Sequence, residues 1–522
     1  MTMVKLAKME TNSVNVATDF KFDLSNGIIA AIHKNYGLMG DADGYKYSHA
    51  FQYPKGAQRM ESYIESRGGS FNKVMMIGCQ LLVLEYFTQR ITMDQVDNIE
   101  SFCKLYNAPF DRNSWETIVT KYDGYPPIEI KSIPEGTVVP TGNVLVTIGS
   151  SADDIDVFSV VSFFETKLLR LWSPCTVGTI SYHIREYLLK MLNDTCDDPQ
   201  SVIDTMLNDF GSRGTTGFEG SAFSGVGLLA NFKGSDNTAA VLAANIAYQS
   251  DITGFTLPAS EHSVVGSWLE GNELKMQKNM LDLYGNGSIL ASVSDTTDIE
   301  HTVKNIWGKE LRQQIIDQNA ILVVRPDSNH QTLMPIKVLE WLDEAFGHTV
   351  NNKGFKVLNH VRVIQGDGIE MNTILEIAGI LYRKGYSIEN MAFGMGGGLL
   401  QKNDRDTLKF ACKCSAIKIN DEWFDVYKNP VDASLWINAD LTIGYEPSAV
   451  ESFKKSKRGR LTLIQHSDTK ECLTIRVDEL ELYDDNWSEL LTPVFRNGKV
   501  LKVWTMDEVW ANAHSDEVFV TK

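Results

Sequence analysis

The chain has 522 residues, of which 43% are apolar and 22% are charged. These fractions are ordinary for a folded globular protein, and the length exceeds what one hydrophobic core usually spans, so we expect two domains. The formal net charge of −18 repels polyanions at long range, which argues against nucleic acid and anionic membranes as partners. A small anionic substrate remains compatible with this charge if arginines gather in a cleft.

The sequence has no run of about 18 apolar residues, so we expect no membrane span. Residues 1–27 lack the continuous apolar segment of a secretory signal, and we interpret them as an N-terminal extension. The seven cysteines are odd in number and form no CxxC pair, which argues against a disulfide framework or structural zinc and favours a cytoplasmic protein. Cys412 and Cys414 would share one face of a strand, most simply in the core.

Apolar runs with polar or glycine-rich tips follow one another through the middle of the chain, after an alternating strand at Val144–Thr147. Segments with the helical spacing of apolar residues separate the runs. This order predicts βα units with a parallel sheet, whose functional groups lie at the carboxyl ends of the strands. The runs are 289–293, 321–324, 361–364 and 390–393, and the helical segments include 333–346 and 374–381.

Alternating strands return at Leu461–Ile464 and Cys472–Arg476, where a hairpin is expected across residues 465–471. We therefore predict an α/β protein with an irregular α/β-barrel as its central domain. The N- and C-terminal parts are expected to form a second, α+β domain that embraces the barrel. The expected domain boundaries are 28–165 and 405–522 for the α+β domain and 166–404 for the barrel.

A glycine-rich loop, Gly394 to Gly398, follows the last of the predicted strands. Bare amides beside a helix N-terminus bind anions, although a tight turn without a ligand gives the same pattern. Two downstream cations, Arg405 and Lys413, favour a phosphate site. The loop matches neither GxxxxGK[ST] nor GxGxxG, which argues against nucleotide sites of those types.

Three arginines, Arg67, Arg213 and Arg325, each stand beside a glycine or proline turn. A guanidinium at a rigid turn suits bidentate recognition of diphosphate, although a single arginine of this kind is more often a surface salt-bridge residue. Three such arginines together with several strand-tip aspartates favour the diphosphate site.

Carboxylates follow three of the predicted strands, at Asp295, Asp327 and Asp367. Carboxylate oxygens suit ribose hydroxyls and magnesium, and each aspartate could instead cap a helix. Glu261 and His262 set an imidazole beside a carboxylate at the start of a helical segment, which is compatible with catalysis or with a structural histidine.

Eight groups of residues resemble, in type and order, the motifs of the nicotinamide phosphoribosyltransferase family, and they span most of the chain from Gly37 to Ala511. They are 43–49 with 52–54, 121–124 with 127–131, 209–214, 231–236, 258–262, 324–328, 363–368 and 387–390. The resemblance implies the type II phosphoribosyltransferase fold and a homodimer with shared active sites. It also implies the conversion of nicotinamide and 5-phosphoribosyl 1-diphosphate into nicotinamide mononucleotide and diphosphate, in NAD salvage.

The resemblance assigns the pyridine ring to a sandwich between Phe210 and Tyr45, the latter from the partner subunit. Two flat faces give an aromatic ligand its best stacking. Asp236 would accept the carboxamide N–H and repel nicotinate, and Arg325 would line the base pocket.

The remaining roles implied by the resemblance concern the sugar, the phosphates and the energy source. Diphosphate would bind Arg67, Arg213, His262 and Arg325, and the ribose would bind Asp327, Gly366 and Asp367. The 5′-phosphate would bind Gly396, Gly397, Arg405 and Lys413. His262, Asp295, Asp327 and Arg325 would be catalytic, with Mg²⁺ at Asp295 and Asp327, and ATP would be a co-substrate that phosphorylates His262.

The chain departs from the family pattern at Asn208, Ser212 and Ala291, which bear on the affinity for the base. Residues 433–453 have no counterpart in the pattern. Two other functions stay open. One is a nicotinate phosphoribosyltransferase, and Asp236 is the residue that distinguishes it from the nicotinamide enzyme. The other is a non-catalytic binding protein on the same scaffold.

Overall fold

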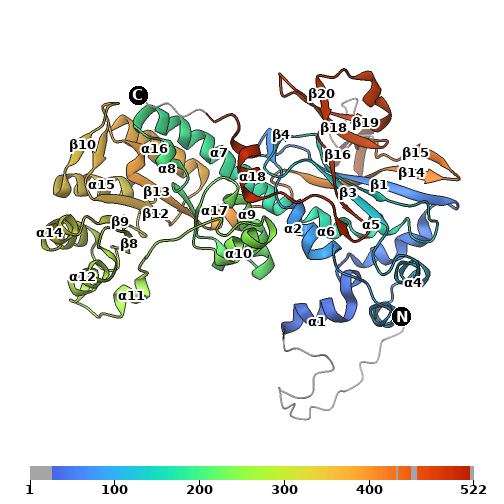
Figure 1. Cartoon of the computed structure of the whole chain (residues 1–522), viewed down its shortest axis with the longest axis horizontal. Helices are drawn as coiled ribbons and strands as arrows, with labels where there is room; N and C mark the ends of the chain where they lie inside the picture. Colours follow the sequence, from blue (N-terminus) through green and yellow to red (C-terminus); the bar gives the residue numbers. More distant parts are fainter. Residues whose placement is uncertain (1–25, 431–432, 448–454, 518–522) are drawn as a thin grey trace, which may run out of the picture.

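A computed structural model describes residues 26–430, 433–447 and 455–517. The predicted N-terminal extension therefore lies almost wholly outside the described residues. Figure 1 shows two lobes, one built on a parallel sheet and the other on an antiparallel sheet. The long helix α7 (Trp172–Thr195) runs between them.

The parallel sheet has six strands in the order β7-β6-β13-β12-β9-β8, and every neighbouring pair is parallel. The strands are β6 (Leu207–Asp209), β7 (Gly234–Ser235), β8 (Ile289–Val293), β9 (Ile321–Arg325), β12 (Val361–Gln365) and β13 (Met391–Met395). The four strands predicted from the sequence are confirmed, and β6 and β7 were not predicted. The helices α15 (Leu333–Phe346) and α16 (Met371–Arg383) confirm the two helical segments.

Each long strand of this sheet has two apolar faces because successive side chains point to opposite sides. Leu322, Val324 and Val363 belong to one large core together with α7, α15 and α16. Val323 and Ile364 face the other way and belong to a separate small cluster. The helices therefore cover one face of the sheet, and the second face is left for the candidate site.

An extended segment, residues 255–260, joins the two edges of the parallel sheet. Phe255 forms a parallel bridge with Gly234 of β7, and Ala259 forms one with Ala291 of β8. The segment thus closes the half-barrel formed by the six strands, and the predicted irregular α/β-barrel is confirmed.

The antiparallel sheet combines strands from both ends of the chain, in the order β15-β14-β1-β5-β3-β21-β22. Its strands are β1 (Ala57–Ser66), β3 (Ile128–Ser132), β5 (Val144–Ser150), β14 (Phe410–Ile419), β15 (Glu422–Asp425), β21 (Thr492–Arg496) and β22 (Lys499–Val500). The predicted α+β domain made of N- and C-terminal parts is confirmed. The exact domain boundaries stay predictions.

Helices pack around this second sheet, and smaller sheets extend it. The helices include α1 (Gly27–Tyr36), α2 (Cys79–Leu82), α3 (Met93–Tyr106), α4 (Arg112–Lys121), α5 (Val160–Phe163) and α6 (Glu165–Leu169), and the 3₁₀ helix η2 spans Gly44–Gln52. Strands β18 (Leu461–His466), β19 (Cys472–Arg476) and β20 (Trp487–Glu489) form one small sheet, and β2 (Lys73–Met75) pairs with β4 (Val138–Pro140). The pairing of β18 with β19 confirms the expected hairpin.

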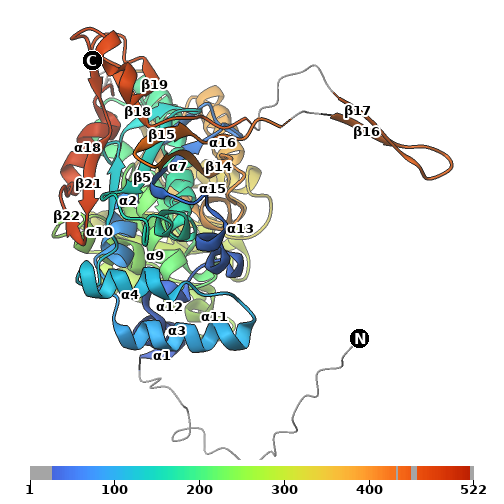
Figure 2. The same cartoon turned by 90° about the vertical axis from the view of Figure 1, so that its right-hand side faces the viewer.

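A second hairpin, β16 (Ala433–Ile437) with β17 (Ile443–Pro447), projects from the body in Figure 2. It occupies most of the segment 433–453 that has no counterpart in the family pattern.

The segment after the C-terminal helix α18 (Met506–His514) is held to α7 by an ion pair. Arg185, which is buried, donates to Glu517 at 3.1 Å and to Asp204 at 2.9 Å. Burial acts to raise the pKa of Glu517, but hydrogen bonds from His514 and Arg185 outweigh it and lower this pKa to about 2.

All seven cysteines are free, and Cys412 is buried in β14 as expected. None of the described helices is long and apolar enough to cross a membrane.

Candidate active site

The candidate site lies at the carboxyl edge of the parallel sheet. Because all six strands run in one direction, the residues that follow them meet at one edge. Nearly all the barrel residues predicted for the site lie at a strand end or within four residues of it: Phe210, Arg213, Asp236, Asp295, Arg325, Asp327, Gly366, Asp367, Gly396 and Gly397. The shared face expected from the strand tips is therefore present in the fold.

His262 and three strand-tip residues form an ionic cluster at this edge. His262 begins α11 (His262–Gly266), directly after the closing segment 255–260. Its Nε2 lies 2.9 Å from Oδ1 of Asp295, and its Nδ1 lies 3.9 Å from Oδ2 of Asp327. Arg325 Nη2 lies 3.3 Å from the same Asp327 oxygen. The cluster brings an imidazole, two carboxylates and a guanidinium together.

Asp295 is the buried member of this cluster, because its side chain is only 2% exposed. Its second oxygen, Oδ2, accepts the backbone N–H of Asp327, at 3.0 Å, and that of Ser328. Burial acts to raise the pKa of Asp295, but hydrogen bonds from Ser328 and His262 outweigh it and lower the pKa. Asp295 is therefore a carboxylate that accepts the Nε2–H of His262, which leaves the Nδ1 lone pair available.

An apolar floor with one aromatic ring lies on the inner face of the half-barrel. Buried Ala291, Val323 and Ile364 form the floor, and Phe210 packs against them together with Leu257 and Ala392. A flat aromatic ligand can lie on such a surface and stack on the Phe210 ring. The departure at Ala291 belongs to this floor.

Gly394 provides the space for the Phe210 ring. A Cβ atom at Gly394 would overlap the Cδ2, Cε2 and Cζ atoms of that ring. At Gly366 a Cβ would lie 3.3 Å from both Phe210 and Asp327 Oδ1. Strand β13 also continues through Met395, so Gly394 belongs to the strand, and only Gly396 to Gly398 lie beyond it.

The loop leads into α17 (Gly397–Leu400), with Gly396 as its N-cap. The first N–H groups of a helix have no intrahelical acceptor, so the amides of Gly397 and Gly398 are available to an anion. This geometry is compatible with the predicted phosphate site, which stays a prediction.

Two charged side chains lie exposed on the turns that follow β6 and β7. Asp236 follows β7, and one of its oxygens accepts the hydroxyl of Thr256 from the closing segment. Arg213 lies in the short turn after Phe210 and is exposed. Nearby, Arg325 Nε and Gln365 Oε1 are buried without a protein partner, as expected beside a polar ligand.

The other four predicted residues lie in the antiparallel lobe. Arg67 follows β1 and donates to Glu65 at 2.6 Å. Lys413 lies on the neighbouring strand β14, and Arg405 precedes that strand. Tyr45 lies in η2 and is 60% exposed. Among the residues described, no hydrogen bond or ion pair joins these four to the site at the strand ends. The chain therefore separates the predicted residues into two sets.

Asp295 and Asp327, the predicted magnesium ligands, both already have partners within the protein. No group of three His, Cys, Asp or Glu side chains within residues 26–430, 433–447 and 455–517 is arranged to hold a metal ion. Both oxygens of Asp295 already accept hydrogen bonds. Asp327 uses Oδ2 with Arg325, so its Oδ1 is the better candidate ligand. One carboxylate plus substrate phosphates is a usual magnesium environment.

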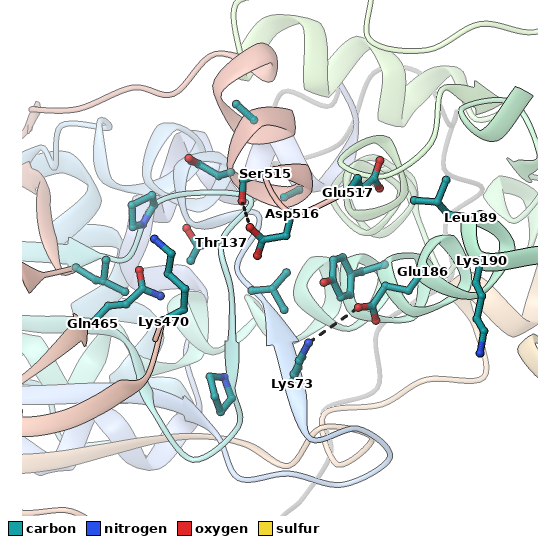
Figure 3. Close-up of a pocket in the computed structure, with 18 of the residues that line it drawn as sticks. Lys73, Thr137, Glu186, Leu189, Lys190, Gln465, Lys470, Ser515, Asp516 and Glu517 are labelled. Carbon is teal, nitrogen blue, oxygen red and sulfur yellow. Dashed lines mark hydrogen bonds and ion pairs between the residues drawn. The ribbon is translucent and has the colours of Figure 1, made fainter. Parts of the chain in front are cut away.

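A cavity of about 780 Å³ lies elsewhere, between α7, the region after α18 and the β18–β19 hairpin (Figure 3). Lys73, Lys190 and Lys470 line it together with Glu186 and Asp516. None of the predicted site residues lines it, and its mixed charge specifies no substrate.

Sequence reasoning missed several residues of this site. Val323, Ile364 and Leu257 of the floor, Thr256 beside Asp236, and Asp209 before Phe210 were not singled out. The signal for the floor was present, since Ile321–Val324 is apolar at every position and must bury both faces. The other residues depend on the closing segment and on β6, which are too short to show hydrophobic periodicity.

Comparison with solved structures identifies the fold. Nicotinate-nucleotide pyrophosphorylase from Pyrococcus furiosus and human Nicotinic Acid Phosphoribosyltransferase each align with a TM-score of 0.54 over 91% of this chain and 93% of theirs. Their sequence identities are 13% and 15%, so the likeness concerns the fold. Residues 205–434 match the Nicotinate phosphoribosyltransferase (NAPRTase) family. The chain therefore has the type II phosphoribosyltransferase fold.

Relatives in sequence narrow this class. Residues 37–130 match the nicotinamide phosphoribosyltransferase N-terminal domain. A nicotinamide phosphoribosyltransferase from Xanthomonas campestris pv. campestris is 40% identical over 92% of this chain and 99% of its own length. One from Acinetobacter baylyi is 28% identical over 90% and 95%. The chain belongs to the nicotinamide phosphoribosyltransferase family of pentosyl-transferring enzymes.

The close approach of Phe210 to Gly394 gives a testable prediction. Gly394→Ala forces the ring away from the floor, so we expect the KM for the pyridine base to rise about tenfold through lost stacking. Steady-state kinetics measure this. Gly220→Ala is the matched control, since a Cβ there meets nothing closer than 3.9 Å. An unchanged KM in Gly394→Ala contradicts the stacking role of Phe210.

Proposed function

We propose that this enzyme transfers the 5-phosphoribosyl group from 5-phosphoribosyl 1-diphosphate to nicotinamide, which gives nicotinamide mononucleotide and diphosphate. Asp236 is the observation that carries this choice of base. Its carboxylate stands exposed at the carboxyl edge of the sheet, one strand away from Phe210. It accepts a carboxamide N–H, whereas it repels the carboxylate of nicotinate. The reaction returns nicotinamide to NAD synthesis.

The transfer itself requires the stabilisation of separating charges. Displacement at the anomeric carbon passes through an oxocarbenium-like state, while the departing diphosphate gains charge. Arg325 and Arg213 stabilise that charge, and Asp327 and Asp367 orient the ribose hydroxyls. Mg²⁺, when bound with the diphosphate, neutralises part of the same charge, and Asp327 is the residue that would hold it.

ATP coupling is proposed to act through His262. Since Asp295 accepts the Nε2–H, the Nδ1 lone pair attacks the terminal phosphorus of ATP, and the phosphorus–oxygen bond to ADP breaks as ADP leaves. Later hydrolysis of the phosphohistidine returns the free imidazole. Asp295 acts here as a positioning residue that fixes the tautomer and the ring orientation.

The complete site is proposed to form between two copies of the chain. The strand-end set holds base, ribose and the amides for phosphate. The antiparallel-lobe set, Arg67, Arg405 and Lys413 with Tyr45, holds further cations and an exposed aromatic ring. A homodimer in which each lobe faces the partner's opposite lobe brings both sets together. A cytoplasmic location stays a prediction from the free cysteines.

The choice of base is tested by steady-state kinetics with nicotinamide and nicotinate. We expect a higher kcat/KM with nicotinamide, and we expect Asp236→Ser to lower the nicotinamide preference by at least about tenfold because the repulsion of nicotinate is removed. Asp251→Ser, an exposed aspartate in the same lobe, is the control and keeps the preference. Faster turnover of nicotinate by the native enzyme contradicts the proposed function.

The role of His262 is tested with ATP labelled at its terminal phosphate. His262→Ala should lose both the acid-labile label and the stimulation by ATP, while a lower basal transfer remains. His301→Ala, at an exposed helical histidine, should keep both. Full stimulation of the His262→Ala enzyme by ATP would rule out the phosphohistidine.

The shared site is tested by mixing two inactive variants, Asp327→Ala and Arg405→Ala, by co-expression. Half of the random dimers are mixed, and one of their two sites is intact, so we expect about a quarter of the native activity. The control pair, Asp327→Ala with Arg213→Ala, has both lesions in the strand-end set and should recover nothing. No recovery in the first pair means that each site lies within one chain.

A further inference from the structure

Asp209 is a fully buried carboxylate that none of the proposed catalytic steps uses. It is the last residue of β6 and directly precedes Phe210. Its strand lies between β13 and β7, where Asp209 pairs with Met395 on one side and with Ser235 on the other. A carboxylate in this position is out of contact with solvent, in the middle of the sheet.

Three hydrogen bonds connect Asp209 to both sides of the base site. Its Oδ1 accepts the N–H of Gly211 at 2.7 Å, which closes the turn that carries Phe210. Its Oδ2 accepts the amide Nδ2–H of Asn237 at 2.9 Å. Its backbone oxygen accepts the N–H of Asp236 at 3.0 Å. One residue thus ties the turn after β6 to the turn after β7.

Asn237 extends this connection into the helices behind the site. Its side-chain oxygen accepts the N–H of Ala240 and so caps α10 (Thr238–Ala247). The same oxygen accepts the hydroxyl of Ser221 at 2.9 Å, from α9 (Phe218–Leu229). Ser221 in turn lies 2.9 Å from the Ser212 hydroxyl, next to Arg213. The network therefore connects the segments that carry Phe210, Asp236 and Arg213.

Burying a carboxylate without a cation is costly. Burial raises the pKa of Asp209 to about 6, although hydrogen bonds from Gly211 and Asn237 oppose this and the charge of Asp236 adds to it. Within the described residues, no Lys, Arg or His forms an ion pair with Asp209. A neutral asparagine would fill the same volume, but it could accept only one of the two N–H donors, since its own NH₂ group would face the other.

We propose that Asp209 is a positioning residue for the base: its two carboxylate oxygens fix the Phe210 turn and the Asp236 turn relative to each other, and so set the affinity for nicotinamide. This inference rests on the proposed function, because Phe210 and Asp236 are the groups assigned to the base there. Asp209 is fully buried and acts through the two turns, so its effect belongs to binding of the base rather than to the transfer step.

The proposal is tested with Asp209→Asn. One N–H donor then loses its acceptor, and the two turns can shift apart. We expect the KM for nicotinamide and its calorimetric Kd to rise about tenfold, with kcat and the KM for 5-phosphoribosyl 1-diphosphate changed less than about threefold. An unchanged KM and Kd for nicotinamide overturn the proposal.

A rescue variant separates positioning from general destabilisation. In Asp209→Asn with Asn237→Asp, the new amide donates to the new carboxylate, so the donor and acceptor are exchanged. We expect the double variant to recover at least part of the affinity for nicotinamide. Glu135→Gln is the matched control, since Glu135 is a fully buried carboxylate in the other lobe that accepts the N–H groups of Gly78 and Gln80. It should lower Tm without raising the KM for nicotinamide.

Ser221→Ala is the milder variant and decides the matter if Asp209→Asn does not fold. It removes one hydroxyl of the same network, and we expect a rise of about threefold in the KM for nicotinamide. An unchanged KM overturns the proposal. A failure of the proposed function gives a different result from a failure of this inference. In that case the native enzyme forms no nicotinamide mononucleotide, while calorimetry still reports the binding of the base.

The dependence of base affinity on pH gives an independent readout. Protonation of Asp209 removes one acceptor, so the KM for nicotinamide of the native enzyme should rise as the pH falls below about 6. The groups packed against Asp209 from β13, α9 and α10 are uncharged, namely Met395, Gly225 and Asn237, and Asp236 is the charged group that acts on it. Asp209→Asn should lack this inflection, and its persistence overturns the proposal.

Discussion

Parallel hydrogen bonding between β6, β13, β12, β9 and β8 is the constraint on which the candidate site depends. Parallel strands must all end at the same edge, so residues that are almost 190 positions apart in the chain, from Asp209 to Gly396, come together there. No single motif contains the site. The ionic cluster around His262 exists because the segment 255–260 bridges both edges of the sheet and delivers its own end beside Asp295. The segment that closes the half-barrel therefore also places His262 in the candidate site.

Successive side chains along each strand point to opposite faces of the parallel sheet, so the two faces have different roles. The outer face packs under the helices and stabilises the lobe, while the inner face, Ala291, Val323 and Ile364, forms the floor of the base site. The floor consists of three side chains, so the position of the Phe210 ring that packs against it must be well defined. Gly394 admits the Phe210 ring by having no side chain, and Asp209 fixes the backbone on either side of that ring.

An acidic chain that is proposed to bind a polyanionic substrate must gather cations locally. Three of the five cations predicted for the phosphates stand beside carboxylates: Arg325 with Asp327, Arg67 with Glu65, and Arg405 with Asp406. Such pairing lowers the repulsion among neighbouring guanidinium groups before the substrate binds. It also orients them, because a guanidinium held on one edge presents its other edge. The division of these cations between two lobes is the physical reason for proposing that two subunits share each site.

The sequence by itself determined the βα order, the apolar runs 289–293, 321–324, 361–364 and 390–393, and the type of residue at each strand tip, because hydrophobic periodicity and tip chemistry are local properties. It also carried the motifs that resemble the family to which the chain belongs. Only the tertiary structure decided that β6 and β7 join the sheet, since strands of three and two residues have no readable period. It alone showed that Gly394 makes room for a ring rather than for a phosphate, that Asp295 already uses both oxygens, and that Arg67, Arg405 and Lys413 lie apart from the strand ends. Those features are distances between residues remote in sequence, which the packing of the whole chain fixes.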